Sequence, residues 1–207
     1  MTKKAVILGT YVNAPYHPFQ GVDEVLRDLI KDEYEVELTD KPERLQTLRR
    51  EGVSLLISYL DAFDTPLPEP IAEEIEAFVL EGGKLLCLHN GISLQTSNRL
   101  YHLIGGKFLR HPPQTELSFT PAEEGVLAGC EGFAISEEPY QFEMSGEDVT
   151  PVLNYVYDGK QYLGGWLREV GQGRIVFLTP GHSLETFRVP QYLDMISRSI
   201  QWLNHAE

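Results

Sequence analysis

The hydrophobic and polar positions follow one pattern in the first half of the chain and another in the second half. In the first half, short apolar runs alternate with stretches in which apolar residues recur at helical spacing. The runs predict buried strands at residues 5–9, 53–60 and 84–88, and an alternating stretch predicts an edge strand at 34–39. The stretches between and after them predict helices at residues 21–32, 42–52, 71–83 and 89–104.

Alternating strands and helices with short loops indicate a parallel sheet that helices cover on both faces. Ligands bind such sheets beyond the carboxyl ends of the strands, where the strand order reverses. The first candidates for a functional site are therefore the residues that follow the strands, at 10–17, 59–64 and 89–92.

The second half contains short strand patterns joined by turn-rich links, at residues 115–121, 133–144, 149–159, 161–171 and 173–181. A helix is predicted at the end, over residues 189–204. No repeat, low-complexity segment or linker divides the chain. We therefore expect residues 1–207 to form a single α/β domain, a three-layer sandwich with a mainly parallel central sheet and a β-rich C-terminal extension.

Composition narrows the classes of partner. The chain has 31 acidic and 17 basic side chains, a formal charge of −14, which argues against binding to nucleic acid or to a membrane surface. Its two cysteines form no C-x-x-C pair, as expected in a reducing compartment. The first apolar run is too short for a signal peptide, and no window is long enough for a membrane span. We expect a cytoplasmic protein.

The histidines are the most informative polar residues. No P-loop, G-x-G-x-x-G, H-E-x-x-H or G-x-S-x-G motif is present. Each loop histidine taken alone fits an ordinary surface position, but four of the six follow strands or lie in loops that could reach one rim. These four are His17, His89, His111 and His182. We expect His102 and His205 to be structural or exposed.

Two further segments offer polar side chains. In SEEPYQFE, the carboxylates of Glu137 and Glu138 could orient an imidazole or bind a metal, and the alternative is an acidic patch at a strand edge. Arg174, just before a strand, fits a surface ion pair as well as an anion ligand.

Several ordered motifs carry a family resemblance over nearly the whole chain. They are GGKLLCLHNG, LIGGKFLRHP, EEPYQFE, GQGRIVFLTPGH and SIQWLN. This series resembles the ThuA-like family, which is named for trehalose utilisation. The resemblance implies the class I glutamine amidotransferase-like superfamily, with a flavodoxin-like sheet and a nucleophile elbow after a central strand.

The elbow carries an unexpected residue. Superfamily glutaminases have a pattern such as L-G-x-C-x-G, and L-C-L-H-N-G aligns with it so that His89 takes the position of the nucleophile. Cys87 falls two places early, inside the strand, and Gly91 matches the glycine that closes the turn. His182 and Glu185 match the glutaminase His-x-Glu pair imperfectly. Because thiolate attack needs both the thiol and its base, we expect the nucleophile to be lost.

The resemblance implies a sugar or keto-sugar derivative as the small-molecule ligand. We expect His89 and His182 to act as acid, base or ligand. Supporting ligands would come from His17, His111 and Glu138, and hydrogen bonds to sugar hydroxyls from Asn90 and Tyr140. A divalent metal such as zinc would suit the same cluster, with candidates His17, His89, His111 and His182.

Substitution should separate functional from structural histidines. We expect His89→Ala and His182→Ala each to abolish ligand or metal binding with little change in stability. The amides of the following helix disfavour a protonated ring, so His89 should be neutral near pH 7 unless a carboxylate such as Glu138 compensates.

Two alternatives stay open. The first is a non-catalytic ligand-binding or assembly protein on an amidotransferase-like scaffold. The second is a cysteine-dependent amidase, which would require an exposed Cys87. A homo-oligomer is compatible with the sequence, and neither nucleic acid nor membrane is expected as a partner.

Overall fold

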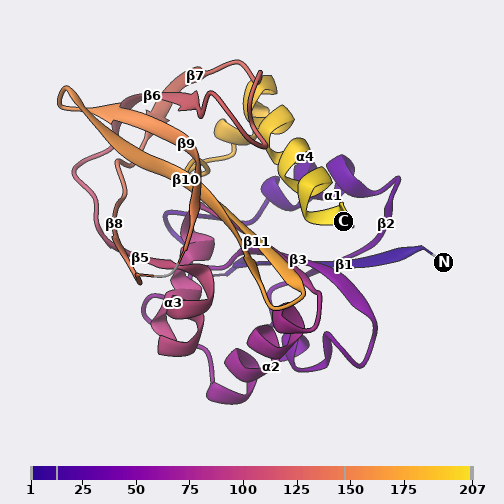
Figure 1. Ribbon diagram of the computed structural model, residues 1–207. Coiled ribbons are helices and arrows are strands. Elements are labelled where there is room, and N and C mark those ends of the chain that lie inside the picture. Colours follow the sequence, from indigo (N-terminus) through magenta and orange to yellow (C-terminus); the bar gives the residue numbers. More distant parts are fainter. Residues whose placement is uncertain (1, 13, 147, 206–207) are drawn as a thin grey trace.

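The central feature of the protein is a nine-stranded sheet. The computed structural model describes residues 2–12, 14–146 and 148–205 (Figure 1). The strand order is β2-β1-β3-β4-β11-β10-β9-β6-β7. In chain order these strands are β1 (Lys3–Gly9), β2 (Tyr34–Thr39), β3 (Val53–Tyr59), β4 (Lys84–Leu88), β6 (Thr115–Pro121), β7 (Phe133–Glu137), β9 (Thr150–Tyr157), β10 (Lys160–Val170) and β11 (Gly173–Leu178).

The sheet has a parallel part and an antiparallel part. From β2 to β11 every pair of neighbouring strands is parallel. The strands β10, β9, β6 and β7 continue the sheet in antiparallel pairs. The predicted α/β fold with a β-rich C-terminal extension is therefore confirmed, and the extension belongs to the same sheet.

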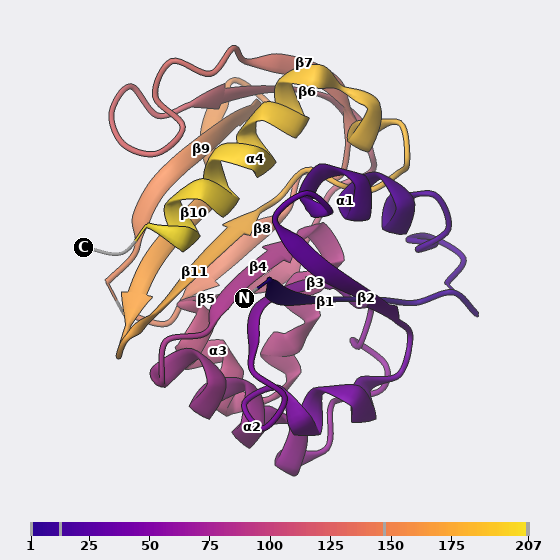
Figure 2. The ribbon, with the colours of Figure 1, turned by 90° about the vertical axis from the view of Figure 1, so that its right-hand side faces the viewer.

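Helices cover both faces of the sheet, so the protein has three layers (Figure 2). One face packs against α1 (Val22–Ile30) and α4 (Pro190–Asn204), and the other against α2 (Glu69–Leu80) and α3 (Asn98–Ile104). Neighbouring residues of a strand point to opposite faces. On β1, for example, Ile7 lies in the first core and Val6 in the second, and both are buried. This explains why the parallel strands are continuous apolar runs.

The structure corrects the prediction of one strand over residues 133–144. That stretch forms two strands in different sheets, β7 and β8 (Gln141–Met144). Strand β8 pairs with β5 (Gly106–Arg110), a strand that the sequence analysis did not predict. Pro139 lies between β7 and β8, where its missing N–H removes a donor from the ladder. The chain therefore leaves the large sheet at Glu138.

A smaller correction concerns the helix predicted over residues 42–52. The structure has a short 3₁₀ helix there, η1 (Pro42–Thr47), followed by turns. Two further 3₁₀ helices are η2 (His89–Thr96) and η3 (Thr186–Arg188). No helix in the described part of the chain is long and apolar enough to cross a membrane.

Candidate functional site

Three histidines meet at the carboxyl edge of the parallel sheet. His17 lies in the loop after β1, His89 directly follows β4, and His182 lies in the loop after β11. The chain brings Glu138 to the same place from the corner between β7 and β8. We call these four residues the histidine–glutamate cluster. Its position is the one at which parallel α/β sheets bind ligands.

The facing atoms of the histidine–glutamate cluster are close together. The Nε2 atom of His17 lies 3.2 Å from Nε2 of His89 and 3.3 Å from Nδ1 of His182. The Oε2 atom of Glu138 lies 3.3 Å from Nε2 of His89, 3.4 Å from Nδ1 of His182 and 3.7 Å from Nε2 of His17. All four atoms lie within 4.8 Å of one another.

These separations fit the ligand set of a tetrahedral metal ion. With zinc–nitrogen bonds of about 2.0–2.1 Å, tetrahedral ligand atoms are about 3.3–3.4 Å apart. Of the six separations among the four atoms, four match that spacing to within about 0.1 Å, the fifth is 3.7 Å, and all are at most 4.8 Å. Three imidazole nitrogens and one carboxylate oxygen are also donors that zinc commonly uses.

Hydrogen bonds outside the cluster fix two of the rings. Nδ1 of His89 lies 2.7 Å from the carbonyl oxygen of Thr179, and Nδ1 of His17 lies 3.1 Å from Oδ2 of Asp61. Carbonyl and carboxylate oxygens accept, so both Nδ1 atoms donate. In the neutral rings the lone pair is then on Nε2, which faces the centre of the cluster. Metal-binding histidines in proteins usually have such partners.

Glu138 supplies a buried acceptor atom at the centre. No donor in the described part of the chain makes a hydrogen bond of good geometry to its Oε2, although three imidazole nitrogens are within 3.7 Å. Burial raises the pKa of Glu138, but interactions with His17, His182 and His89 outweigh it and hold the pKa well below its usual range. Glu138 is therefore ionised, and a cation at the centre would satisfy its oxygen.

The pKa values of the two buried imidazoles are shifted in opposite directions. Burial lowers the pKa of His89, so this ring is neutral near pH 7, as the sequence analysis expected, although burial is the main cause. Burial also acts to lower the pKa of His17, but Asp61 and Glu138 outweigh it and raise the pKa. Of these two rings, His17 is therefore the one that is more readily protonated.

The backbone at His89 has the conformation expected of an elbow. His89 has a φ of 46°, in the left-handed region that non-glycine residues rarely adopt. A Cβ atom at Gly91 would lie 2.0 Å from the carbonyl oxygen of Ser58, so the turn can close only over glycine. Cys87 is fully buried in β4, and burial raises the pKa of its thiol.

Glu137, which the sequence offered as a carboxylate that could orient an imidazole or bind a metal, instead positions a loop through its backbone. Its carboxylate is fully buried, and Oε1 accepts hydrogen bonds from the backbone N–H of Gly181 at 2.8 Å, the N–H of His182 at 3.0 Å and the hydroxyl of Thr186 at 2.6 Å. These contacts fix the loop that carries His182. The two adjacent glutamates thus have different roles. Glu137 fixes the loop, and Glu138 faces the three imidazoles of the cluster.

The remaining predicted residues lie around the cluster. His111 is exposed, with Nε2 3.6 Å from Oε1 of Glu138, outside the set of four facing atoms. The buried ring of Tyr140 stacks on His89 at a centroid distance of 4.4 Å. Asn90 is fully buried, and its Nδ2 donates to the carbonyl oxygen of Tyr59 at 2.9 Å. Asp61 lies in the predicted rim segment 59–64 but was not singled out.

The fold and the cluster define a flavodoxin-like α/β domain with a histidine-rich site at the carboxyl ends of its strands. The family model for ThuA, described as trehalose utilisation, matches residues 8–203. The chain belongs to the ThuA family. No curated protein matches the sequence.

Solved structures show the same fold at low sequence identity. A ThuA-like protein from Bacteroides uniformis superposes with a TM-score of 0.78 and 15% identity, over 97% of this chain and 91% of that one. A ThuA-like protein from Parabacteroides merdae gives 0.79 and 13%, over 98% and 90%. A cold-adapted β-galactosidase from Rahnella sp. R3 gives 0.67 and 13%, over 97% of this chain but 32% of its own.

Proposed function

We propose that the histidine–glutamate cluster binds a divalent metal ion, with zinc as the best fit, and that the protein binds or transforms a sugar or keto-sugar derivative there. The observation that carries the metal is the convergence of four donor atoms, of whose six separations four match the spacing of zinc ligands. The sugar rests on the family description, trehalose utilisation, and on the shared fold of a β-galactosidase domain.

Each residue has a defined part in this proposal. His17, His89 and His182 hold the ion and Glu138 completes the set, while Asp61 and Thr179 orient the first two rings. A bound zinc ion would polarise the carbonyl oxygen of a keto sugar. Oε1 of Glu138 lies 3.6 Å from Nε2 of His111, whose exposed imidazole could hydrogen-bond a bound sugar.

The same proposal excludes thiol chemistry. His89 occupies the elbow, and the nearest cysteine is buried in the strand with a raised pKa. A glutaminase needs an exposed thiolate next to a base. In this proposal the amidotransferase nucleophile is therefore lost. We also propose a cytoplasmic location, because both cysteines are free, as is usual in a reducing compartment.

Metal analysis tests the proposal. Purified protein should contain close to one equivalent of zinc or take it up in titration, and His182→Ala should bind at least about 100-fold more weakly, as expected when a metal ligand is removed. His205→Ala is the matched control, because its side chain is exposed and remote from the histidine–glutamate cluster. Equal zinc binding by wild type and His182→Ala would overturn the proposal.

A second function, non-catalytic ligand binding or assembly, is favoured by one observation. The cluster offers four protein donors, the number found in structural zinc sites, whereas catalytic sites keep one position open. Cobalt-substituted protein separates the two functions. A change of the cobalt absorption spectrum on adding a keto sugar indicates an accessible metal, and an unchanged spectrum indicates a closed, structural one.

A further inference from the structure

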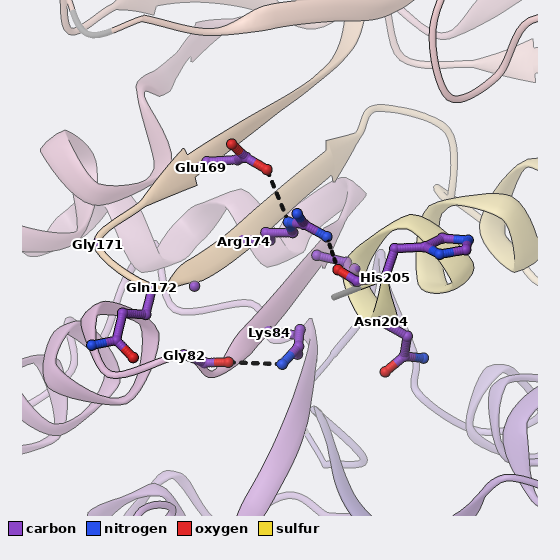
Figure 3. Close-up of a pocket in the computed structure, with 10 residues that line it drawn as sticks. Gly82, Lys84, Glu169, Gly171, Gln172, Arg174, Asn204 and His205 are labelled. Carbon is purple, nitrogen blue, oxygen red and sulfur yellow. Dashed lines mark hydrogen bonds and ion pairs between the residues drawn. The ribbon is translucent and has the colours of Figure 1, made fainter. Parts of the chain in front are cut away.

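A cavity of about 400 Å³ opens at the edge of the sheet opposite the histidine–glutamate cluster. It lies at the amino ends of β4 and β11, beside the carboxyl end of α4 (Figure 3). Its lining includes Gly82, Lys84, Glu169, Arg174, Asn204 and His205. The two cations of the lining are Lys84, the first residue of β4, and Arg174, the second residue of β11.

Positive charge gathers here although the protein carries a net charge of −14. Lys84 Nζ donates to the carbonyl oxygen of Gly82 at 2.9 Å, and Lys3 Nζ, close by, donates to Oδ1 of Asn204 at 3.2 Å. Within the described part of the chain, no carboxylate pairs with either lysine. Each ammonium group therefore keeps donors for a ligand.

Arg174 is held in place by its neighbours. Its Nε donates to Glu169, the acidic residue of the lining, at 2.9 Å, and its Nη1 donates to the carbonyl oxygens of Trp202, at 3.0 Å, and His205. The guanidinium also lies over the Trp202 ring, 5.1 Å from the centroid. Four contacts thus fix this cation, so little side-chain entropy would be lost when it meets a ligand.

Like charges around Lys84 make an anion favourable. Its side chain is partly buried, and burial, together with Lys3 and Arg174, lowers the pKa of the ammonium group. An anion in the cavity would relieve this repulsion. Lys3, Lys84 and Arg174 against Glu169 leave a net charge of +2, which matches a dianion, and the volume leaves room for a small organic group beside it.

We propose that this cavity binds a small multivalent oxyanion of the phosphate type, free or as a phosphate ester, with Lys84 and Arg174 as its direct ligands and Lys3 as a supporting charge. The site is separate from the histidine–glutamate cluster, so it adds an anion-responsive surface to whatever reaction or binding occurs at the opposite edge of the sheet.

Inorganic phosphate is the first probe, titrated calorimetrically and by melting temperature against sodium chloride of equal ionic strength. Phosphate should raise the melting temperature of the wild type more than chloride does. The dissociation constant should rise about tenfold or more in Lys84→Gln, as expected for the loss of a charge-assisted hydrogen bond. Lys160→Gln is the control, because Lys160 is exposed at the start of β10 and outside the lining.

A second lysine variant and a second ligand test the role of Lys3 and the kind of anion that binds. Lys3→Gln should weaken phosphate binding by a smaller factor, and glucose 6-phosphate binding more tightly than inorganic phosphate would identify an ester as the ligand. Equal responses to phosphate and chloride, or equal phosphate binding by wild type and Lys84→Gln, would overturn the proposal. So would loss of the phosphate response in His182→Ala but not in Lys84→Gln, because the anion would then bind at the histidine–glutamate cluster.

Discussion

At the scale of single residues, the elbow at His89 is defined by its backbone. The left-handed φ of His89 and the close approach of Gly91 to Ser58 are properties of the turn, independent of which side chain it presents. The turn presents an imidazole that stacks on Tyr140 and faces three other donors. Such strained backbone is typical of functional sites, and here it lies at a residue of the histidine–glutamate cluster.

Gly91→Ala should test the turn directly. The new Cβ would lie 2.0 Å from a backbone oxygen, so the turn or β3 must shift, and we expect a loss of more than about 2 kcal/mol in the free energy of unfolding. Urea denaturation measures the loss. Gly125→Ala is the control, because its Cβ meets nothing within 4 Å and its positive φ alone costs about 1 kcal/mol. Equal losses would show that the elbow is not closely packed.

Cys87 should behave as a core residue without chemistry. It has no exposed surface, whereas Cys130 is partly exposed, so thiol reagents should label Cys130 first and Cys87 only after unfolding. Mass spectrometry of labelled peptides separates the two thiols. Cys87→Ala should bind zinc as the wild type does. Rapid native labelling of Cys87, with loss of zinc binding on substitution, would restore a thiol mechanism.

The histidine variants should differ in stability more than the sequence analysis expected. The sequence suggested that neither His89→Ala nor His182→Ala would matter for stability. Because His89 is fully buried, stacked on Tyr140 and bonded to Thr179, its removal leaves a cavity and an unpaired carbonyl, at about 2 kcal/mol or more. His182 is partly exposed and should cost less than about 1 kcal/mol. Chemical denaturation of metal-free protein measures both, and equal costs would contradict this ranking.

At the scale of elements, the corner between β7 and β8 shapes the site. The strand pattern on both sides of Pro139 conceals the change of sheet, because alternation of polar and apolar residues says nothing about which strand is the partner. The corner allows Glu137 to reach the loop after β11 and Glu138 to reach the three imidazoles. One short segment therefore fixes two parts of the site.

Glu137→Gln should weaken metal binding indirectly. An amide keeps one acceptor oxygen but brings an N–H₂ group toward the N–H of His182, so the loop loses a charge-assisted hydrogen bond. We expect zinc affinity to fall about tenfold and the amides of residues 181–186 to exchange faster in hydrogen-exchange measurements. Glu138→Gln is the comparison, because it should weaken zinc binding without faster exchange there. Unchanged exchange in Glu137→Gln would remove its positioning role.

The sequence predicts the histidines of the histidine–glutamate cluster better than the groups that accept hydrogen bonds from their rings. His17, His89 and His182 could be found because each follows a predicted strand, and parallel strands end at one edge. Asp61 and Thr179 could not, because an acidic residue or a carbonyl group after a strand is common and its role depends on ring orientation. His111 shows the opposite limit, since its loop reaches the rim but its ring approaches Glu138 from outside the set of four facing atoms.

At the scale of the whole molecule, two polar sites lie at opposite ends of the same two strands. Lys84 begins β4 and His89 follows it. At 3.3 Å per residue, the strand therefore separates the cavity beside Lys84 and Arg174 from the histidine–glutamate cluster by about 16 Å. Strand β11 repeats the arrangement with Arg174 and His182. Groups farther apart than about 10 Å, with no shared partner, usually act additively.

Zinc stabilisation should therefore be the same with and without Lys84. Zinc at 100 times its dissociation constant should add about 2.7 kcal/mol to the free energy of unfolding of the wild type. Lys84→Gln should gain the same amount within about 0.5 kcal/mol, and His182→Ala should gain almost nothing. Urea denaturation with and without zinc measures all three gains. A Lys84→Gln gain that is smaller by about 1 kcal/mol or more would show that the sheet couples its two edges, and the cavity would then act on the histidine–glutamate cluster through β4 and β11.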